Sequence, residues 1–124
     1  MNPKSPTPQI AELSVKAVSR MKMNAERTVN FCIESLKDVL GSDEGNISYM
    51  VKAYAEAIYV NDKLADYLDK LSESRPIITT KKTKIKKYVL DIQDIFMIEA
   101  LVNTKMALAD AFPAMTGGRS LGIH

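Results

Sequence analysis

The sequence predicts an all-α fold in which three long helices form an antiparallel, bundle-like arrangement, with a basic arm between the second and third helices. Apolar residues recur at helical spacing in three long segments, and glycine or proline separates these segments. Short connections place consecutive helices side by side in opposite directions. Because 124 residues is the size of one domain, we expect a single helical domain over 1–124, with tails at 1–7 and 113–124 and the arm at 75–84.

The first helix is predicted to start at Thr7 and Pro8 and to end before Gly41. Threonine can cap the free amides of a helix, proline suits the first helical position, and glycine commonly follows the last turn. A helix of this length would span roughly 50 Å, so a break near Met23 and Asn24 is an open alternative. Its apolar stripe comprises Ile10, Ala17, Met21, Ala25, Val29, Cys32, Leu36 and Leu40.

The second helix is predicted to follow a cap at Asn46 and to end at Ser74, because Arg75 precedes Pro76 and such residues avoid the α region. Its apolar stripe comprises Ile47, Met50, Val51, Tyr54, Ile58, Ala65, Leu68 and Leu71.

The third segment begins with β-branched residues at 77–80 and continues into lysines. We interpret it as an extended arm that leads into a helix over about 85–112, which Pro113 ends; a short β-hairpin is the alternative. The apolar stripe of this helix comprises Ile85, Tyr88, Val89, Ile92, Ile95, Phe96, Leu101, Val102, Met106, Ala109 and Phe112.

The residues needed for most catalytic and metal sites are missing from the sequence. The only histidine is His124, at the end of a glycine-containing tail, and the only cysteine is Cys32, which we expect to be a small buried apolar residue. Neither a GxxxxGKS/T loop nor a GxGxxG motif is present. We therefore expect no enzymatic activity, no catalytic residue, no cofactor and no metal.

Four acidic residues share one face of the second helix, and they are the best candidates for a divalent-ion site. The Glu-x-x-His pairs of a dinuclear carboxylate site are missing, so we interpret this face as an acidic surface paired with Lys63, Lys70 or a basic neighbour. The four residues are Asp62, Asp66, Asp69 and Glu73.

The polar, proline-containing N-terminus does not resemble a secretory signal, and no charge-free run is long enough to span a membrane. We expect a cytoplasmic protein, or one inside a nucleoprotein particle, that has no membrane partner and no small-molecule substrate.

Charge is strongly segregated along the chain. Residues 75–90 carry six basic side chains and no acid, whereas residues 31–74 carry nine acids against four lysines. Tyr88 follows the lysine cluster and is predicted to stack on a base or sugar. The basic residues that we predict to bind nucleic acid are Lys16, Arg20 and Arg27, on one face of the first helix, and Lys81, Lys82, Lys84, Lys86 and Lys87, in the arm and directly after it.

These features predict a non-enzymatic structural subunit that contacts the backbone of DNA or RNA without sequence preference and packs into a larger nucleoprotein assembly. The acidic second helix of one copy could meet the basic arm of another copy. Four apolar residues of the first helix also lie off its apolar stripe, and they either contact further partners or are singly exposed: Val15, Met23, Phe31 and Ile33. The alternative is a helical adaptor or inhibitor that binds an acidic protein surface without nucleic acid.

In size, helix content and charged faces the chain resembles both the small helical subunits of CRISPR effector complexes and the helical coat proteins of filamentous viruses that wrap DNA. No motif specific to either class is present, so the resemblance assigns no residue a role.

Overall fold

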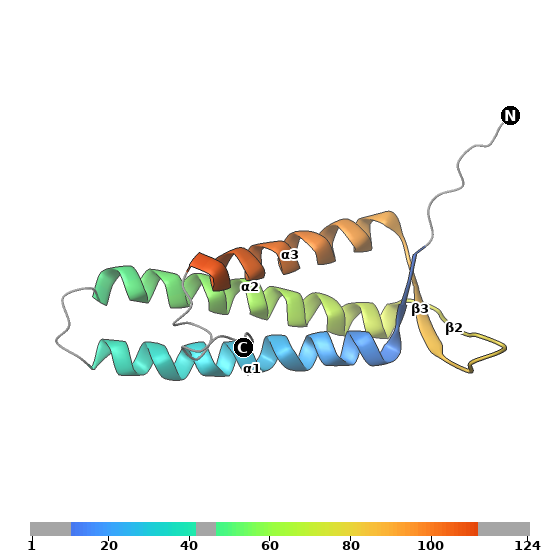
Figure 1. Ribbon diagram of the computed structural model, residues 1–124, viewed down its shortest axis with the longest axis horizontal. Coiled ribbons are helices and arrows are strands. Elements are labelled where there is room, and N and C mark those ends of the chain that lie inside the picture. Colours follow the sequence, from blue (N-terminus) through green and yellow to red (C-terminus); the bar gives the residue numbers. More distant parts are fainter. Residues whose placement is uncertain (1–10, 42–46, 112–124) are drawn as a thin grey trace, which may run out of the picture.

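The structure, a computed structural model, describes residues 11–41 and 47–111. The predicted tails at 1–7 and 113–124, the caps Thr7 and Asn46, and His124 lie outside these residues. The elements in chain order are β1 (Ala11–Ser14), α1 (Val15–Leu40), α2 (Ile47–Ser74), β2 (Ile77–Thr79), β3 (Lys86–Leu90) and α3 (Ile92–Ala111). Three helices make up most of the described chain, and a small sheet covers one of their ends (Figure 1). The prediction of a mainly helical fold is confirmed, but all-α is only approximate because of this sheet.

Helices α1 and α2 lie side by side, run in opposite directions and form the most extensive contact in the structure (Figure 1). Toward the sheet, Ala25 of α1 packs with Leu64 and Leu68 of α2. At the other end, buried Cys32 packs with a group of α2 residues that includes Ala57, as expected for a small apolar side chain. Helix α1 continues through Met23 and Asn24 without the break that its length allowed.

Helix α3 runs along α2 and contacts it less extensively than α1 does (Figure 1). Apolar residues occur all around α3, which is typical of a helix that is covered on every side. Yet Ile98 is the only buried apolar residue of α3, and Phe96 and Met106 keep 63% and 57% of their surface exposed. One side of α3 therefore has no covering among the described residues.

The sheet has the antiparallel order β1-β3-β2, so the central strand joins two segments that are far apart in sequence. Leu13 of β1 and Ile77 of β2 both lie opposite Tyr88 of β3. Alternate residues of β3 face the core, where Tyr88 and Leu90 are buried. The predicted helix over 85–112 is therefore wrong in its first part, and the hairpin alternative is correct: residues 86–90 alternate as a strand, and α3 starts at Ile92.

The predicted start of the first helix at Thr7 and Pro8 is also wrong, because residues 11–14 form β1. Ser14 has an extended backbone, and its side chain accepts a hydrogen bond from the Ala17 amide at 3.0 Å, so Ser14 caps α1. The two predicted helix ends, before Gly41 and at Ser74, are confirmed.

Candidate nucleic-acid interface

Strands β2 and β3 form a hairpin that extends beyond the ends of the helices (Figure 1). Its tip is closed by Thr80, whose amide donates to the Ile85 carbonyl at 3.0 Å and whose hydroxyl oxygen accepts from the Ile85 amide at 3.0 Å. The Thr80 and Thr83 hydroxyls also share a hydrogen bond. Lys84 adopts a left-handed backbone with φ of 59°, which turns the chain back into β3. The predicted arm is therefore an ordered, hydrogen-bonded turn.

The structure divides the five lysines of residues 81–87 into two groups. Lys81, Lys82, Lys84 and Lys86 are exposed, and none of them forms an ion pair with a described residue. Lys87 is only partly exposed, and its Nζ lies 3.6 Å from a Glu12 carboxylate oxygen on β1. The charge of Lys87 is thus partly balanced within the protein, whereas the other four charges face water.

The three basic residues of α1 that we predict to bind nucleic acid are exposed and also lack ion pairs with described residues: Lys16, Arg20 and Arg27. Lys16 lies two positions after Ser14, which pairs with Lys87 in the sheet, so the start of this row lies beside the sheet. Arg27 is roughly 16 Å farther along the helix at 1.5 Å per residue, and it borders a groove between α1 and α3. The exposed basic residues therefore lie on two surfaces. One is the hairpin tip, with Lys81, Lys82, Lys84 and Lys86, and the other is a row along α1, with Lys16, Arg20 and Arg27.

Tyr88 does not have the role predicted from its position next to the lysines. Only 6% of its surface is exposed, and it belongs to the main hydrophobic core beside Leu90 and Leu68. Its place on β3 explains this, because Tyr88 points to the inner face of the sheet. The apolar residues that are exposed near the lysines are isoleucines instead: Ile77, Ile78 and Ile85.

The base of the hairpin is held by an ion pair that the sequence analysis did not identify. Arg75 donates from Nε and Nη2 to the two carboxylate oxygens of Asp94, each at 2.6 Å, and Tyr67 donates its hydroxyl to the same carboxylate at 2.5 Å. The Asp94 side chain is completely buried. Arg75 precedes β2 and Asp94 follows β3, so this pair ties together both ends of the hairpin segment.

This environment shifts the pKa values of Asp94 and Tyr67. Hydrogen bonding from the Arg75 guanidinium, together with the Tyr67 hydroxyl, lowers the pKa of Asp94 to about 2. Burial, and then the hydrogen bond to the carboxylate, raises the pKa of Tyr67. Asp94 is therefore charged and Tyr67 protonated across the whole neutral range.

Asp94 also fixes the start of α3. Its carboxylate accepts from the Asp91 amide at 3.1 Å, while the Asp91 carboxylate accepts from the Asp94 amide at 3.0 Å. This reciprocal pattern is that of a capping box, with aspartate in both positions. The sequence signal for this helix start was a pair of aspartates three residues apart, Asp91 and Asp94.

The acidic face of α2 is partly neutralised by lysines. Asp66 pairs with Lys70 at 3.2 Å, as predicted, and Asp69 pairs with Lys22 of α1 at 2.8 Å. The hydrogen bond that Lys22 donates to the Asp69 carboxylate raises the pKa of Lys22. Lys63 lies instead over the Tyr59 ring, 5.6 Å from its centre. Within residues 11–41 and 47–111, no cluster of three potential metal ligands occurs.

Comparisons with protein family models, with curated proteins and with solved structures found no match to this chain. Among the helices of the described segments, none combines the length and apolar character needed to cross a membrane.

Proposed function

We propose that this protein is a non-enzymatic structural subunit of a larger nucleoprotein assembly, and that its hairpin tip binds the phosphate backbone of a nucleic acid. The observation that carries the proposal is a group of exposed lysines on a projecting hairpin whose base is fixed by Arg75 and Asp94. These lysines form no ion pair with a described residue: Lys81, Lys82 and Lys84. The row of Lys16, Arg20 and Arg27 on α1 provides a second set of phosphate contacts.

The chemistry of these surfaces favours binding without sequence preference. A lysine ammonium is a point charge that releases counterions when it neutralises a phosphate, and this term depends on salt rather than on base identity. Sequence reading relies largely on the bidentate hydrogen bonds that arginine, asparagine and glutamine form with base edges, and residues 80–84 at the hairpin tip contain none of these three residue types.

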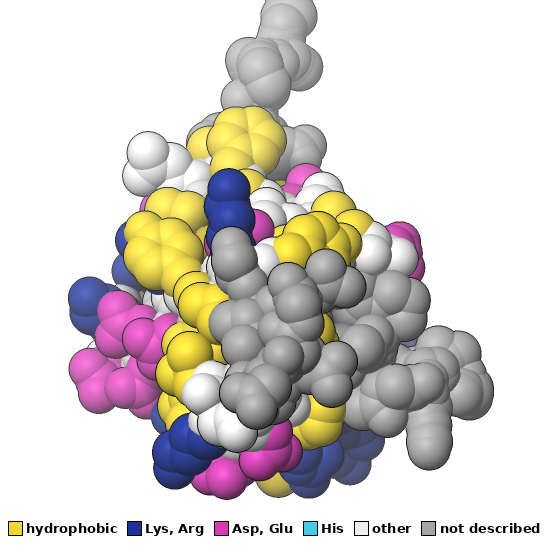
Figure 2. All heavy atoms as spheres, turned by 90° about the vertical axis from the view of Figure 1, so that its left-hand side faces the viewer, with side chains coloured by type: hydrophobic (Ala, Val, Ile, Leu, Met, Phe, Trp, Pro, Cys, Tyr) yellow, Lys and Arg dark blue, Asp and Glu magenta, His cyan; other side chains and the backbone are white. Residues whose placement is uncertain are grey.

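The assembly part of the proposal rests on exposed apolar residues. Three of the four apolar residues that lie off the α1 stripe are exposed, namely Met23, Phe31 and Ile33, while Val15 packs against the core and is not available. Helix α3 adds the exposed Phe96. At the end of the helices away from the sheet, hydrophobic side chains also reach the surface between charged ones (Figure 2). We propose that neighbouring subunits cover these surfaces and complete an antiparallel, bundle-like arrangement around α3.

The proposal is tested by binding labelled duplex and single-stranded nucleic acids across a salt series, followed by fluorescence anisotropy. We expect the wild-type affinity to fall steeply with salt. In a variant carrying Lys81→Gln, Lys82→Gln and Lys84→Gln, the logarithmic slope should be shallower by about 3, because each phosphate contact contributes about one unit.

The matched control removes three lysines elsewhere, with Lys37→Gln, Lys52→Gln and Lys63→Gln, and therefore lowers the net charge equally. Its slope should stay close to that of the wild type. The proposal is wrong if the wild type does not bind at about 50 mM salt, where electrostatic binding is strong, or if the two variants weaken binding equally.

A second candidate function is an adaptor or inhibitor that binds an acidic protein surface. The exposed Ile77, Ile78 and Ile85 beside the lysines favour it, because protein interfaces combine an apolar centre with a polar rim. Absence of nucleic-acid binding in the same titration, with binding to a purified acidic protein that the hairpin variant loses, would support this function instead.

A further inference from the structure

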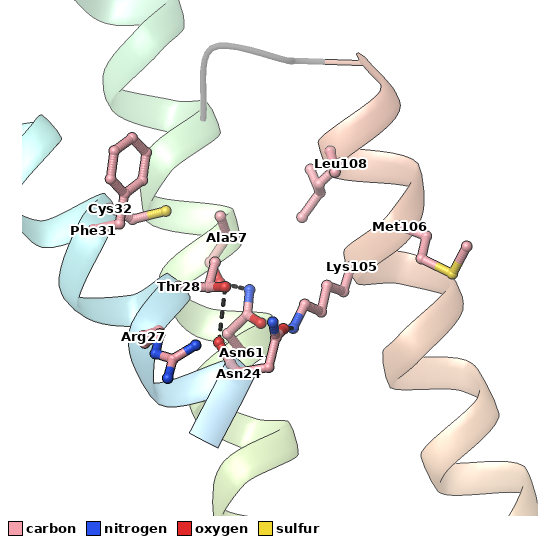
Figure 3. Close-up of a pocket in the computed structure, with 11 residues that line it drawn as sticks. Asn24, Arg27, Thr28, Phe31, Cys32, Ala57, Asn61, Lys105, Met106 and Leu108 are labelled. Atoms are coloured by element: carbon pink, nitrogen blue, oxygen red, sulfur yellow. Dashed lines mark hydrogen bonds between the residues drawn. The ribbon is translucent and has the colours of Figure 1, made fainter. Parts of the chain in front are cut away.

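A groove of about 510 Å³ lies between α1 and α3, and buried residues of α2 form its floor. Its volume falls within the range of about 300–1,000 Å³ that is typical of small-molecule sites. One end of the groove is apolar: Phe31 and Cys32 lie on α1, opposite Leu108 on α3 (Figure 3). Small-molecule sites commonly combine such a lining with a few polar groups.

The other end of the groove is polar and cationic. Lys105 is partly buried, and burial lowers its pKa. Its ammonium donates a hydrogen bond to the Asn24 side-chain oxygen, a neutral partner (Figure 3). Arg27 borders the same end, and no aspartate or glutamate is among the described residues that line the groove. Two positive charges thus lie at one end of an apolar groove without a carboxylate beside them.

Asn61 on the floor of the groove has an unused hydrogen-bond acceptor. The residue is 1% exposed, and its Nδ2 donates to the Ala57 carbonyl at 2.8 Å, whereas its Oδ1 receives no hydrogen bond from the described residues. Leaving a buried polar atom unpaired costs about 1–3 kcal/mol, so a ligand that donates a hydrogen bond to this oxygen would bind more tightly. Asn61, Asn24 and Lys105 point toward the same part of the groove (Figure 3).

We propose that this groove binds a small amphipathic carboxylate that carries a hydroxyl group on its β-carbon. The alkyl part lies between Phe31 and Leu108, the carboxylate accepts hydrogen bonds from Lys105 and Arg27, and the hydroxyl donates to Asn61 Oδ1. The groove is separate from the hairpin tip and shares only Arg27 with the basic row of α1, so this inference does not depend on nucleic-acid binding by the hairpin.

Calorimetric titration of the full chain with three eight-carbon ligands tests the proposal: 3-hydroxyoctanoate, octanoate and octan-1-ol. We expect 3-hydroxyoctanoate to bind about 2- to 10-fold more tightly than octanoate, which is the value of one neutral hydrogen bond. Octan-1-ol should bind at least about 10-fold more weakly than octanoate, because it forgoes the charge-assisted bonds.

Two substitutions separate the parts of the site. Lys105→Met should reduce the preference for octanoate over octan-1-ol, because only Arg27 then remains to bind the carboxylate. Asn61→Leu should remove the preference for the hydroxylated acid. Lys52→Met, an exposed lysine on α2, serves as the control and should change neither preference. If Asn61→Leu does not fold, the comparison of the two acids on the wild-type protein still decides the role of Asn61.

Several outcomes would overturn the proposal. Equal affinity for the acids and the alcohol would show an apolar groove without anion recognition, and equal affinity for the two acids would leave Asn61 without a role. If no ligand binds at about 1 mM, the proposal is wrong, and a dimer in solution would then indicate that a second copy covers the groove. The triple hairpin variant should retain ligand binding, so that failure of this proposal and failure of nucleic-acid binding are distinguishable.

Discussion

Asp94 connects three parts of the molecule through one buried carboxylate. It accepts hydrogen bonds from Arg75 before β2, from Tyr67 in α2 and from the Asp91 amide at the start of α3. Both oxygens of the Asp94 carboxylate accept hydrogen bonds, and the bidentate Arg75 guanidinium balances its charge. A buried pair of this kind adds little stability over an apolar alternative, but losing one partner is costly.

The substitution Asp94→Asn is expected to lower the free energy of unfolding by about 3 kcal/mol. This lies at the low end of the range for breaking buried pairs, because the Arg75 side chain keeps 30% of its surface exposed and regains contact with water. Urea denaturation measures the change. Asp66→Asn is the matched control: its exposed pair with Lys70 should contribute less than about 1 kcal/mol. Equal losses in the two variants would contradict a special role for Asp94.

The low pKa of Asp94 also predicts acid sensitivity. The pKa is about 2 in the folded protein and about 3.9 in an unfolded chain, so the carboxylate stabilises the fold above pH 4 and loses this contribution as the pH falls toward 2. Between pH 5 and about pH 2, the wild type should therefore lose more stability than Asp94→Asn, as measured by urea denaturation at each pH. Parallel pH profiles of the two proteins would contradict the prediction.

At the scale of elements, the hairpin shows why a cluster of lysines was difficult to interpret. The segment 85–90 has apolar residues at positions compatible with both a helix and a strand, and its helical interpretation merged it with α3. Tyr88 and Leu90 alternate with more exposed residues, as in a strand. This segment is a strand because β1 and β2 provide hydrogen-bond partners on both of its sides. Asp91 then separates strand from helix by capping α3.

Lys84 at the hairpin turn gives a test of this element. Its φ of 59° is unfavourable for lysine, and asparagine tolerates this region better. We expect Lys84→Asn to raise the free energy of unfolding by about 0.5–1 kcal/mol. Lys82→Asn removes the same charge from the same turn and should leave stability unchanged, since Lys84 is the only non-glycine residue with positive φ in the described chain.

Because Lys84→Asn and Lys82→Asn each remove one charge, both should reduce the salt slope of nucleic-acid binding by about 1. Thermal denaturation and anisotropy together measure the two effects. A stability gain in both variants, or in neither, would show that the backbone of Lys84 is not strained.

At the scale of the whole molecule, opposite charges occupy different regions. The hairpin tip is basic, whereas a groove between α1 and α2 is lined by Glu26, Asp62, Asp66 and Asp69 against a single lysine, Lys22. Because these are two different surfaces of one molecule, a contact between them joins copies head to tail. Each added copy still has one free surface, so the assembly can continue to grow.

This arrangement predicts self-association that depends on salt. Sedimentation velocity should detect larger species at about 0.1 M salt, where the screening length is about 10 Å, and fewer at 1 M, where it is about 3 Å. The variant with Lys81→Gln, Lys82→Gln and Lys84→Gln should remain smaller at low salt, whereas the triple control at Lys37, Lys52 and Lys63 should behave like the wild type. Association that persists at high salt would point instead to the exposed apolar face of α3, including Phe96.

The sequence by itself determined the features that depend on near neighbours in the chain. Helical spacing located most of α1 and α2, Gly41 and Pro76 marked their ends, and Cys32 could be expected in the core because its stripe is apolar. The lysine cluster was equally visible, since charge density is a property of composition.

Only the tertiary structure decided which of these residues are available for binding. β1 and β3 are paired although Ala11 and Leu90 lie far apart in sequence, and this pairing buries Tyr88 and brings Lys87 to Glu12. The ion pair between Arg75 and Asp94 likewise depends on how the hairpin folds back. The physical reason is that strands and buried charges are stabilised by distant partners, whereas a helix forms its hydrogen bonds within four residues of the same chain.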